Sequence, residues 1–378
     1  MVVPDIKCNR PVEENAMNTT TQLTQPDTRD METFEERLVG ALNEAGMLMM
    51  LSMGHRLALF EAMQDGRALT SRDLADRTGL NERYVREWLG ALTAAGVLTM
   101  SPSDHRYRLP PAHAALLTND GEANMAVFTQ YLPMMGQVEE DILHCFRHGG
   151  GVPYDRFPRF HAIMAEDSGQ TVLAALFDHI LPLAPELPER LDKGIRVLDV
   201  GCGRGKALIL MAERYRNSEF SGYDLSEEAV AWARSQSKDK GLDNLTFEAR
   251  DLSDFDQTAT PGAFDLVTTF DAIHDQARPL NVLTGIRRTL KDDGIYLAQD
   301  IHAHTDHHKN TDHPVGAFLY ALSIHHCMTV SLAQDGEGLG TMWGREQAVR
   351  YMETAGFRDI RVERLDHDIQ NDYFICRP

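Results

Sequence analysis

Three glycines at alternate positions, Gly201, Gly203 and Gly205, restrict the chemistry of this chain more than any other pattern in it. Glycine has no Cβ and adopts positive φ readily, so a ligand can approach its backbone closely. A short apolar run at 197–200 precedes the glycines, and apolar residues at helical spacing follow from Lys206. The pattern predicts a buried strand, a tight turn and a helix, which together form the first unit of a nucleotide-binding α/β fold.

Acidic residues around this turn narrow the choice of ligand. A dinucleotide fingerprint would have its third glycine at the position of Lys206. Instead, Asp199 stands two positions before Gly201, and Asp224 ends the next expected strand, 219–224. An acid about 20 residues beyond a glycine turn is placed to hydrogen-bond a ribose diol. The spacing therefore predicts a ribose-containing ligand that is not a dinucleotide.

Further polar residues follow the later strands, which are expected at 245–249, 264–270 and 294–300. Ligands of open α/β sheets bind outside the carboxyl ends of the strands, so residues at these ends should converge on one edge. The residues expected at that edge are Gly201, Asp224, Asp251, Asp271, His274 and Asp300.

The combination resembles the class I S-adenosylmethionine-dependent methyltransferases, from about Met31 to the end of the chain. It is most similar to a subgroup that pairs the segment GLNERYVREWLG at 79–90 with FDAIHDQARP at 270–279 and HCMTVS at 326–331. The resemblance implies a Rossmann-like α/β sheet with helices on both faces, an N-terminal winged helix, methyltransferase activity and S-adenosyl-L-methionine as cofactor. It also implies that Asp251 contacts the adenine amino group while Leu252 packs on the ring. The residues expected to bind the cofactor are Asp199, Gly201, Gly203, Gly205, Asp224, Leu225, Asp251, Leu252 and Phe270.

Composition excludes several classes of function. The chain has 378 residues, 37 Lys and Arg against 57 Asp and Glu, and a formal net charge of -20. Such acidity argues against a surface that binds nucleic acid or anionic membranes without specificity. No stretch approaches the ~18 apolar residues of a membrane span, and no signal peptide is evident. The 5 cysteines are scattered, which favours a reducing, cytoplasmic location.

Four regions are expected along the chain. Residues 1–30 are polar and predict a disordered tail. Residues 31–110 predict a winged-helix dimerisation domain, in which Thr70 and Asn81 begin helices. Residues 111–190 predict a helical connector that forms a wall of the acceptor pocket, and residues 191–378 predict the cofactor-binding catalytic domain. A methionine-rich helical stretch at 47–53 is apolar on nearly every side, which predicts a buried helix, often against a partner subunit.

A winged helix also raises the alternative of DNA binding. The expected second helix offers Arg83 and Arg86, but it also carries Glu82 and Glu87, and the surrounding segment is not basic. DNA-binding modules of this kind usually show a net basic face. Many small-molecule methyltransferases use such a domain to form dimers and to close the acceptor pocket. The resemblance therefore implies a homodimer that acts on a small molecule and binds neither nucleic acid nor membrane.

The acceptor atom follows from what stands after the fourth strand. In the plant-type O-methyltransferases the catalytic histidine lies a few residues beyond an H-D-W motif. Here the sequence His-Asp-Gln at 274–276 resembles that motif, but the downstream positions 279–281 are Pro-Leu-Asn. The usual base is absent, which favours an acidic acceptor such as a thiol, because a thiol is partly ionised near neutrality. Some relatives of the subgroup are linked to methylation of small sulfur compounds.

The remaining candidates for chemistry come from outside the glycine turn. His274 is a candidate base or acceptor-orienting group, with a structural role as the alternative. The full catalytic set considered is His274, Asp271, His302 and His326. The candidates for substrate contact, with interdomain packing as the alternative, are Tyr131, Tyr154, Phe157 and His161.

The segment 301–344 is rich in histidine, and it is expected to form a lid over the pocket. Only His304 and His308 have the spacing of a helical metal-binding pair, and they lie in a polar stretch, so no metal site is predicted. The predicted function is methylation of a small soluble acceptor, with sulfur ahead of oxygen. An O-methyltransferase of a hydroxylated metabolite and a regulator that senses the cofactor are the alternatives.

Overall fold

A computed structural model describes residues 28–119 and 123–378, so most of the expected tail lies outside the described residues. The chain divides into two units, residues 1–45 and 46–378. Helix α1, Thr28–Arg56, begins in the first unit, and its first three residues belong to the stretch expected as tail. Within the described residues, no helix is both long and apolar enough to cross a membrane.

The expected apolar face of α1 is present on the described part of the first unit. Phe34, Leu38 and Leu42 recur at helical spacing and are exposed. In the second unit, Leu51 is buried, but Met53 is 45% exposed. The methionine-rich stretch is therefore only partly buried within one chain, and its predicted burial against a partner subunit stays a prediction.

A winged-helix domain follows α1, as predicted. Thr70 caps the first of its helices by accepting from the backbone N–H of Asp73, whose carboxylate in turn accepts the backbone N–H of Thr70. Asn81 caps the next helix through the backbone N–H of Arg83. The elements of this domain are α2 Ser71–Thr78, α3 Glu82–Ala94, β1 Thr99–Ser101, β2 Arg106–Arg108 and α4 Pro111–Leu117.

The connector is mainly helical. Its α-helices are α5 Tyr131–Gln137, α6 Glu139–His148, α7 Phe160–Ser168 and α8 Leu187–Lys193. Two π-helical turns, Gly169–Leu173 and Leu176–Ile180, continue α7 toward the catalytic domain. The described part of the chain also contains short 3-10 turns, at Glu61–Met63, Phe128–Gln130, Tyr154–Arg156, Leu181–Leu183 and His307–Asn310.

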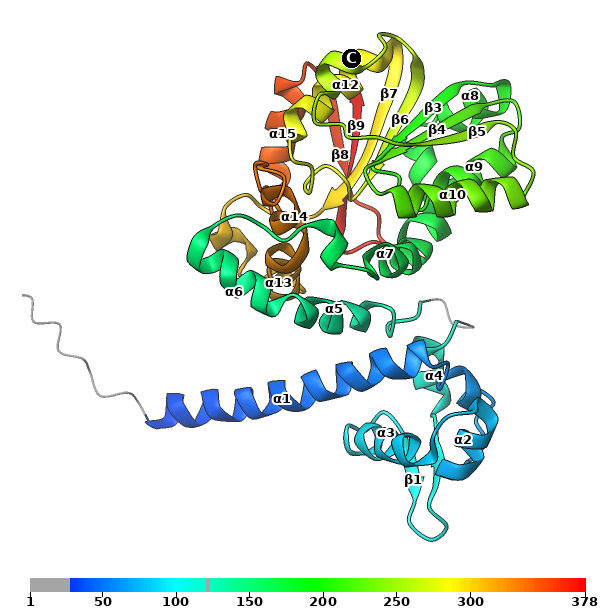
Figure 1. Cartoon of the computed structure of the whole chain (residues 1–378), viewed down its shortest axis with the longest axis vertical. Helices are drawn as coiled ribbons and strands as arrows, with labels where there is room; N and C mark the ends of the chain where they lie inside the picture. The colour runs from blue at the N-terminus through cyan, green and yellow to red at the C-terminus, as the bar shows by residue number, and fades with distance from the viewer. Residues whose placement is uncertain (1–27, 120–122) are drawn as a thin grey trace, which may run out of the picture. The chain divides into compact units, whose positions relative to one another are not determined.

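The catalytic domain is built on a seven-stranded sheet with the order β5-β4-β3-β6-β7-β9-β8 (Figure 1). The first five of these strands are parallel, and β9 pairs antiparallel with both β7 and β8. The predicted Rossmann-like sheet is thus confirmed, and it ends in two antiparallel strands. The strands are β3 Arg196–Val200, β4 Glu219–Asp224, β5 Leu245–Ala249, β6 Phe264–Phe270, β7 Leu290–Ile301, β8 Asp359–Glu363 and β9 Asn371–Arg377.

Helices cover both faces of this sheet (Figure 1). On one face, Leu208 and Met211 of α9 pack with Val197 of β3. On the other face, Ile286 of α12 and Met352 of α15 pack in a second apolar cluster. The helices of the domain are α9 Lys206–Arg214, α10 Glu227–Asp239, α11 Phe255–Thr258, α12 Pro279–Thr289 and α15 Arg345–Thr354.

The chain leaves β3 toward β4 on one side and reaches β6 on its other side, so the strand order reverses at β3. Open α/β sheets bind ligands at such a switch point, outside the carboxyl ends of the strands. The glycine turn directly follows β3, so this topology places the turn where a ligand is expected.

The histidine-rich segment, which was expected to form a lid, is helical over part of its length. It contains α13 Gly316–Leu322, a π-helical turn at Ser323–Cys327 and α14 Met328–Leu332. Leu319 and Val330 are fully buried, which explains the helices, since their apolar faces pack into two clusters.

Candidate active site

The glycine turn needs glycine for two different reasons. All three glycines have positive φ, at 72°, 53° and 63° for Gly201, Gly203 and Gly205. A Cβ on Gly201 would lie 2.5 Å from the Cβ of Ala272, and one on Gly205 would lie 2.2 Å from Phe247 Cε1. A Cβ on Gly203 would meet nothing within 4 Å. Packing therefore requires glycine at the two outer positions, whereas the middle glycine leaves its face open to a ligand.

Asp224 is fixed at the end of β4 by the turn itself. Its Oδ2 accepts the backbone N–H of Gly203 at 2.7 Å, and its Oδ1 accepts that of Ser226 at 2.8 Å. Each carboxylate oxygen can accept more than one hydrogen bond, so each keeps capacity for a ligand hydroxyl. The geometry fits the predicted contact with a ribose diol.

Asp199 lies inside β3 and is 3% exposed. The Oγ1 of Thr268, on the neighbouring strand β6, donates to its Oδ1 at 2.7 Å. Burial raises the pKa of Asp199 to about 7, although the Thr268 hydrogen bond opposes that shift. The carboxyl group therefore changes charge near neutrality.

These groups line one cavity, whose empty volume is about 1180 Å³ when the space at its open mouth is included. Every residue predicted to bind the cofactor lies on its wall. They are Asp199, Gly201, Gly203, Gly205, Asp224, Leu225, Asp251, Leu252 and Phe270.

The opposite part of the wall comes from the connector. Tyr154, Phe160, His161 and Met164 line it, and the rings of Tyr154 and His161 stack at a centroid distance of 6.1 Å. Burial lowers the pKa of His161, so this histidine is neutral near neutrality. Two of the four predicted substrate contacts, Tyr154 and His161, are therefore on the cavity wall.

The structure does not bring the other two predicted substrate contacts to the cavity. Tyr131 is buried, and its hydroxyl donates to Asp167 Oδ2 at 2.8 Å. Phe157 is also buried and packs edge-on against His326 with a centroid distance of 4.8 Å. Both belong to the apolar cluster beneath the connector, so their packing role replaces the predicted contact with substrate.

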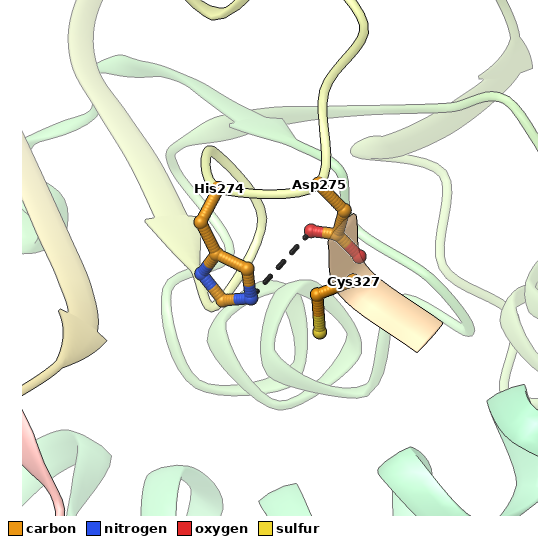
Figure 2. A group of neighbouring side chains, drawn as sticks. All are labelled: His274, Asp275 and Cys327. Atoms are coloured by element: carbon orange, nitrogen blue, oxygen red, sulfur yellow. Dashed lines mark ion pairs between the residues drawn. The ribbon is translucent and has the colours of Figure 1, made fainter. Parts of the chain in front are cut away.

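His274 lies behind the cavity wall, in a cluster of buried groups. Its Nδ1 lies 2.7 Å from Asp300 Oδ1, and its Nε2 lies 3.7 Å from Asp275 Oδ1 (Figure 2). Burial opposes a charge on this imidazole, but the adjacent Asp300 carboxylate, together with that of Asp275, raises the pKa of His274 well above its ordinary value. Since His274 does not line the cavity, the prediction that it acts directly on the acceptor is not supported by its position.

Asp275 is the polar group that the sequence analysis passed over. It is 7% exposed, it lines the cavity, and its Oδ2 accepts the hydroxyl of Tyr154 at 3.1 Å. Burial raises the pKa of Asp275 to about 6. Asp275 lies inside the 274–276 motif that resembles H-D-W, so the sequence contained a signal for it. Nothing in the sequence indicated that Asp275 pairs with Tyr154, because the two residues are distant in the chain.

The remaining catalytic candidates are held elsewhere by their own partners. His302 Nδ1 lies 3.0 Å from Asp372 Oδ1, which also pairs with Arg345. His326 is fully buried and stacks on Phe160 at 3.5 Å. Asp271 accepts from the Gln299 side chain at 3.1 Å. None of the three candidates lines the cavity, so their positions give no support to the predicted catalytic roles.

The predicted lid is also corrected. Among the described residues of 301–344, only Gln334 lies on the cavity wall. His304 is held outside it by Glu346, at 2.7 Å between Nδ1 and Oε1.

Comparisons with known families agree with this architecture. Residues 191–344 match the family model of a methyltransferase domain, and residues 45–119 match that of an Rv2258c-like winged HTH domain. Among solved structures, the chain is similar to a mitomycin 7-O-methyltransferase, with a TM-score of 0.67, 17% identity and coverage of 93% of this chain and 100% of that one. It is also similar to human N-acetylserotonin methyltransferase in complex with S-adenosylmethionine, with a TM-score of 0.64, 16% identity and coverage of 94% and 99%.

Curated relatives match over a shorter stretch. A fatty-acid O-methyltransferase of Mycolicibacterium smegmatis is 31% identical over 108 residues, which are 29% of this chain and 38% of the relative. A ubiquinone biosynthesis O-methyltransferase of Cereibacter sphaeroides is 30% identical over 129 residues, or 34% of this chain and 48% of the relative. The chain thus spans less than half the length of each of these two relatives.

Proposed function

We propose that this chain, which pairs a winged HTH domain with a methyltransferase domain, methylates an acidic oxygen of a small apolar molecule. The cofactor of the methyltransferase domain is S-adenosylmethionine, which supplies an electrophilic methyl group on a sulfonium. The acceptor class goes beyond the family and rests on the cavity and on the residues near it.

One observation carries the proposal, namely that a single cavity is lined by two chemically different walls. On one wall, Gly203 leaves an open face and Asp224 is fixed by backbone N–H groups. On the other, Phe160 and Met164 provide apolar surface, and the Tyr154 hydroxyl and Asp275 carboxylate provide a hydrogen-bonded polar pair. A polar nucleoside donor fits the first wall, and an apolar acceptor with one polar end fits the second.

The absence of a histidine at 279–281 favours an acceptor that is already ionised. These residues begin α12, and Asn281 there donates to the backbone of Ser253 at 2.7 Å and is not free to act as a base. A carboxylic acid with a pKa near ~4 is ionised at neutral pH, whereas a phenol near ~10 needs a base. The relatives named above as fatty-acid and ubiquinone O-methyltransferases support oxygen as the methylated atom. Sulfur, predicted from the sequence, stays a prediction that the same assay tests.

In such a reaction the protein mainly aligns the donor with the acceptor and removes water from around them. Holding two reactants in line can contribute about 7–11 kcal/mol relative to free reactants in water. The Tyr154–Asp275 pair is placed to orient a polar acceptor group, and the apolar residues around it exclude water. Because an anionic acceptor and a cationic donor lose their charges as the bond forms, a water-poor site favours the transition state.

The test is turnover on a matched panel of acceptors. Purified protein is incubated with S-adenosylmethionine and carboxylic acids, phenols, hydroxy acids or thiols that share one alkyl chain, and products are followed by mass spectrometry. We expect methyl esters, or ethers of acidic hydroxyls, to form fastest. Methylation of the thiols alone would reject the oxygen assignment and support sulfur. Turnover on none of these classes, by protein that binds the cofactor, would favour the cofactor-sensing regulator.

We further propose a homodimer that binds no nucleic acid. The exposed apolar residues Phe34, Leu38 and Leu42 of α1 support a protein partner for that helix. On α3, Arg83 pairs with Glu87 and Arg86 pairs with Glu82, so neither arginine is free for phosphate. A cytoplasmic location stays the prediction drawn from the scattered cysteines.

A further inference from the structure

We propose that His274, Asp275 and Cys327 bind a divalent transition-metal ion, with Zn²⁺ as the best match. The three side chains come from the loop after β6 and from the π-helical turn before α14, and Figure 2 shows them grouped together. One ligand atom from each lies within 4.8 Å of the other two, and all three residues are buried. A nitrogen, an oxygen and a sulfur ligand together suit zinc better than magnesium or calcium.

The ligand atoms would have to move closer together around a metal ion. With Zn–N and Zn–O of about 2.0 Å and Zn–S of about 2.3 Å, ligand atoms of a tetrahedral zinc stand about 3.3–3.5 Å apart. The Nε2 of His274 and the Oδ1 of Asp275 are separated by 3.7 Å. This is too long for a hydrogen bond, but it is close to the separation of two ligands of one metal ion.

The groups behind these ligands are arranged as in metal sites. His274 Nδ1 lies 2.7 Å from Asp300 Oδ1, which also accepts the backbone N–H of Ile301 and the indole N–H of Trp343. A carboxylate at Nδ1 fixes the imidazole so that the Nε2 lone pair is free for a metal. The Oδ1 of Asp300 is itself occupied by these three contacts, so Asp300 suits the role of support better than that of ligand.

Asp275 shows the same division between support and ligation. Its Oδ2 is held by the Tyr154 hydroxyl, whereas its Oδ1 is buried and has no hydrogen-bond partner among the described residues. Buried polar atoms without a partner are rare, and each calls for an explanation. A metal ion between Oδ1 of Asp275 and Nε2 of His274 supplies one.

A metal-free alternative is a protonated His274 between the Asp300 and Asp275 carboxylates. That ion triad accounts for Asp300, but it leaves Oδ1 of Asp275 at 3.7 Å without a hydrogen bond. In that triad Cys327, which is 5% exposed and beside the pair, interacts with His274 but, among the described residues, has no contact that links it to Asp275 through a shared partner. The metal accounts for all three side chains at once.

One consequence rests on the proposed function. Three protein ligands leave a fourth position for water or substrate, and Asp275 also lines the cavity. A hydroxyl or thiol bound to the metal loses its proton more readily, so the metal would supply the activation that the missing histidine does not. The metal site itself depends only on these side chains and not on the acceptor.

The experiment measures metal directly, on full-length protein purified without a histidine tag. We expect about one zinc per chain by elemental analysis after reconstitution at micromolar free Zn²⁺. With Co²⁺ in place of Zn²⁺, a thiolate-to-cobalt absorption band should appear in the near ultraviolet. Cys327→Ser should lose that band and at least tenfold in metal affinity. Cys376→Ser, a change at another buried cysteine on β9, is the matched control and should keep both.

A second measurement covers the case in which Cys327→Ser fails to fold. X-ray absorption at the zinc edge of the unaltered protein should show one sulfur neighbour at about 2.3 Å. Metal below about one tenth of an equivalent, a zinc shell without sulfur, or a cobalt band that survives Cys327→Ser would overturn the inference. Metal content is read without turnover, so a protein that methylates without metal refutes this site alone. A protein that binds metal but methylates nothing refutes the proposed function alone.

Discussion

Replacing Gly203 with alanine tests whether the glycine turn is needed for ligand binding as well as for folding. Gly203 has φ 53°, and an added Cβ would meet no protein atom within 4 Å. The substitution therefore introduces backbone strain of about 1–2 kcal/mol but no clash within the protein. Gly79, at the end of α2, has φ 69° and the same open surroundings, so Gly79→Ala is a control with matched strain but far from the turn in sequence.

The two variants should lose similar stability and differ in ligand binding. Both should lower the free energy of unfolding by about 1–2 kcal/mol, which corresponds to a few degrees in Tm for a protein of this size. Of the two glycines, only Gly203 lies on the cavity wall, so only its added Cβ is expected to meet a nucleoside bound there. Forcing a methyl group into a close-packed contact costs about 1–3 kcal/mol, or roughly 5- to 150-fold in Kd.

Calorimetric titration with S-adenosylhomocysteine, alongside thermal unfolding, measures both quantities. We expect Gly79→Ala to bind as the unaltered protein does and Gly203→Ala to bind at least fivefold more weakly. Equal binding by Gly203→Ala would show that no ligand approaches this glycine, and the assignment of the turn to the cofactor would fail. Gly205→Ala, whose Cβ would lie 2.2 Å from Phe247, should instead impair folding.

Three further predictions concern carboxylates. Asp224→Asn should weaken S-adenosylhomocysteine binding by about 1.5–3 kcal/mol for each charged hydrogen bond lost, whereas Asp65→Asn, which also alters an acid that accepts a backbone N–H, should leave the Kd unchanged. Because Asp199 has a pKa of about 7 and is ionised above it, the affinity for S-adenosylmethionine should fall as pH drops below 7, and titrations of Asp199→Asn should show no such dependence. Burial raises the pKa of Asp167 to about 6 from 3.8, so the protonated form favours the fold, and stability is lost as pH rises from about 4 to about 6. The control is Asp167→Asn, whose side-chain oxygen still accepts the Tyr131 hydroxyl. Relative to this variant, the free energy of unfolding of the unaltered protein in urea should fall by about 3 kcal/mol between pH 4 and pH 7. Parallel plots of unfolding free energy against pH for the two proteins would contradict this.

The strands and the glycine turn could be predicted because their signals are local. The run before Gly201 is apolar because β3 is buried on both faces, and the turn residues follow directly in the chain. The position of Asp224 could be predicted equally well, since its place at the end of β4 follows from the strand pattern. All nine predicted cofactor residues lie on the cavity wall for this reason: each lies in or just after the carboxyl-terminal part of a strand, and the sheet brings these strand ends together.

The acceptor side could not be predicted in the same way, because its contacts join distant segments. Tyr154 reaches Asp275 across the boundary between connector and catalytic domain, and Cys327 reaches His274 from a helical turn far along the chain. Nothing in the spacing of these residues reports such pairings. The many histidines of 301–344 also gave no indication of the helices there, which form because apolar residues of the segment pack into the core.

The positions of the histidines limit which acceptors the site can methylate, because few of them could serve as a base. Among the described residues, His161 is the only histidine on the cavity wall, and burial keeps it neutral. His274 is bounded by Asp300 at one ring nitrogen and faces Asp275 and Cys327 with the other, so it cannot turn toward an acceptor without breaking the 2.7 Å contact with Asp300. A neutral alcohol would thus find no imidazole on the cavity wall other than that of His161, whose Nδ1 lies 3.7 Å from Glu228 Oε2, to take its proton. An acid that arrives ionised, or an acceptor that a metal ion activates, needs none, and for this reason the acidic acceptor and the metal site follow from the same arrangement of His274.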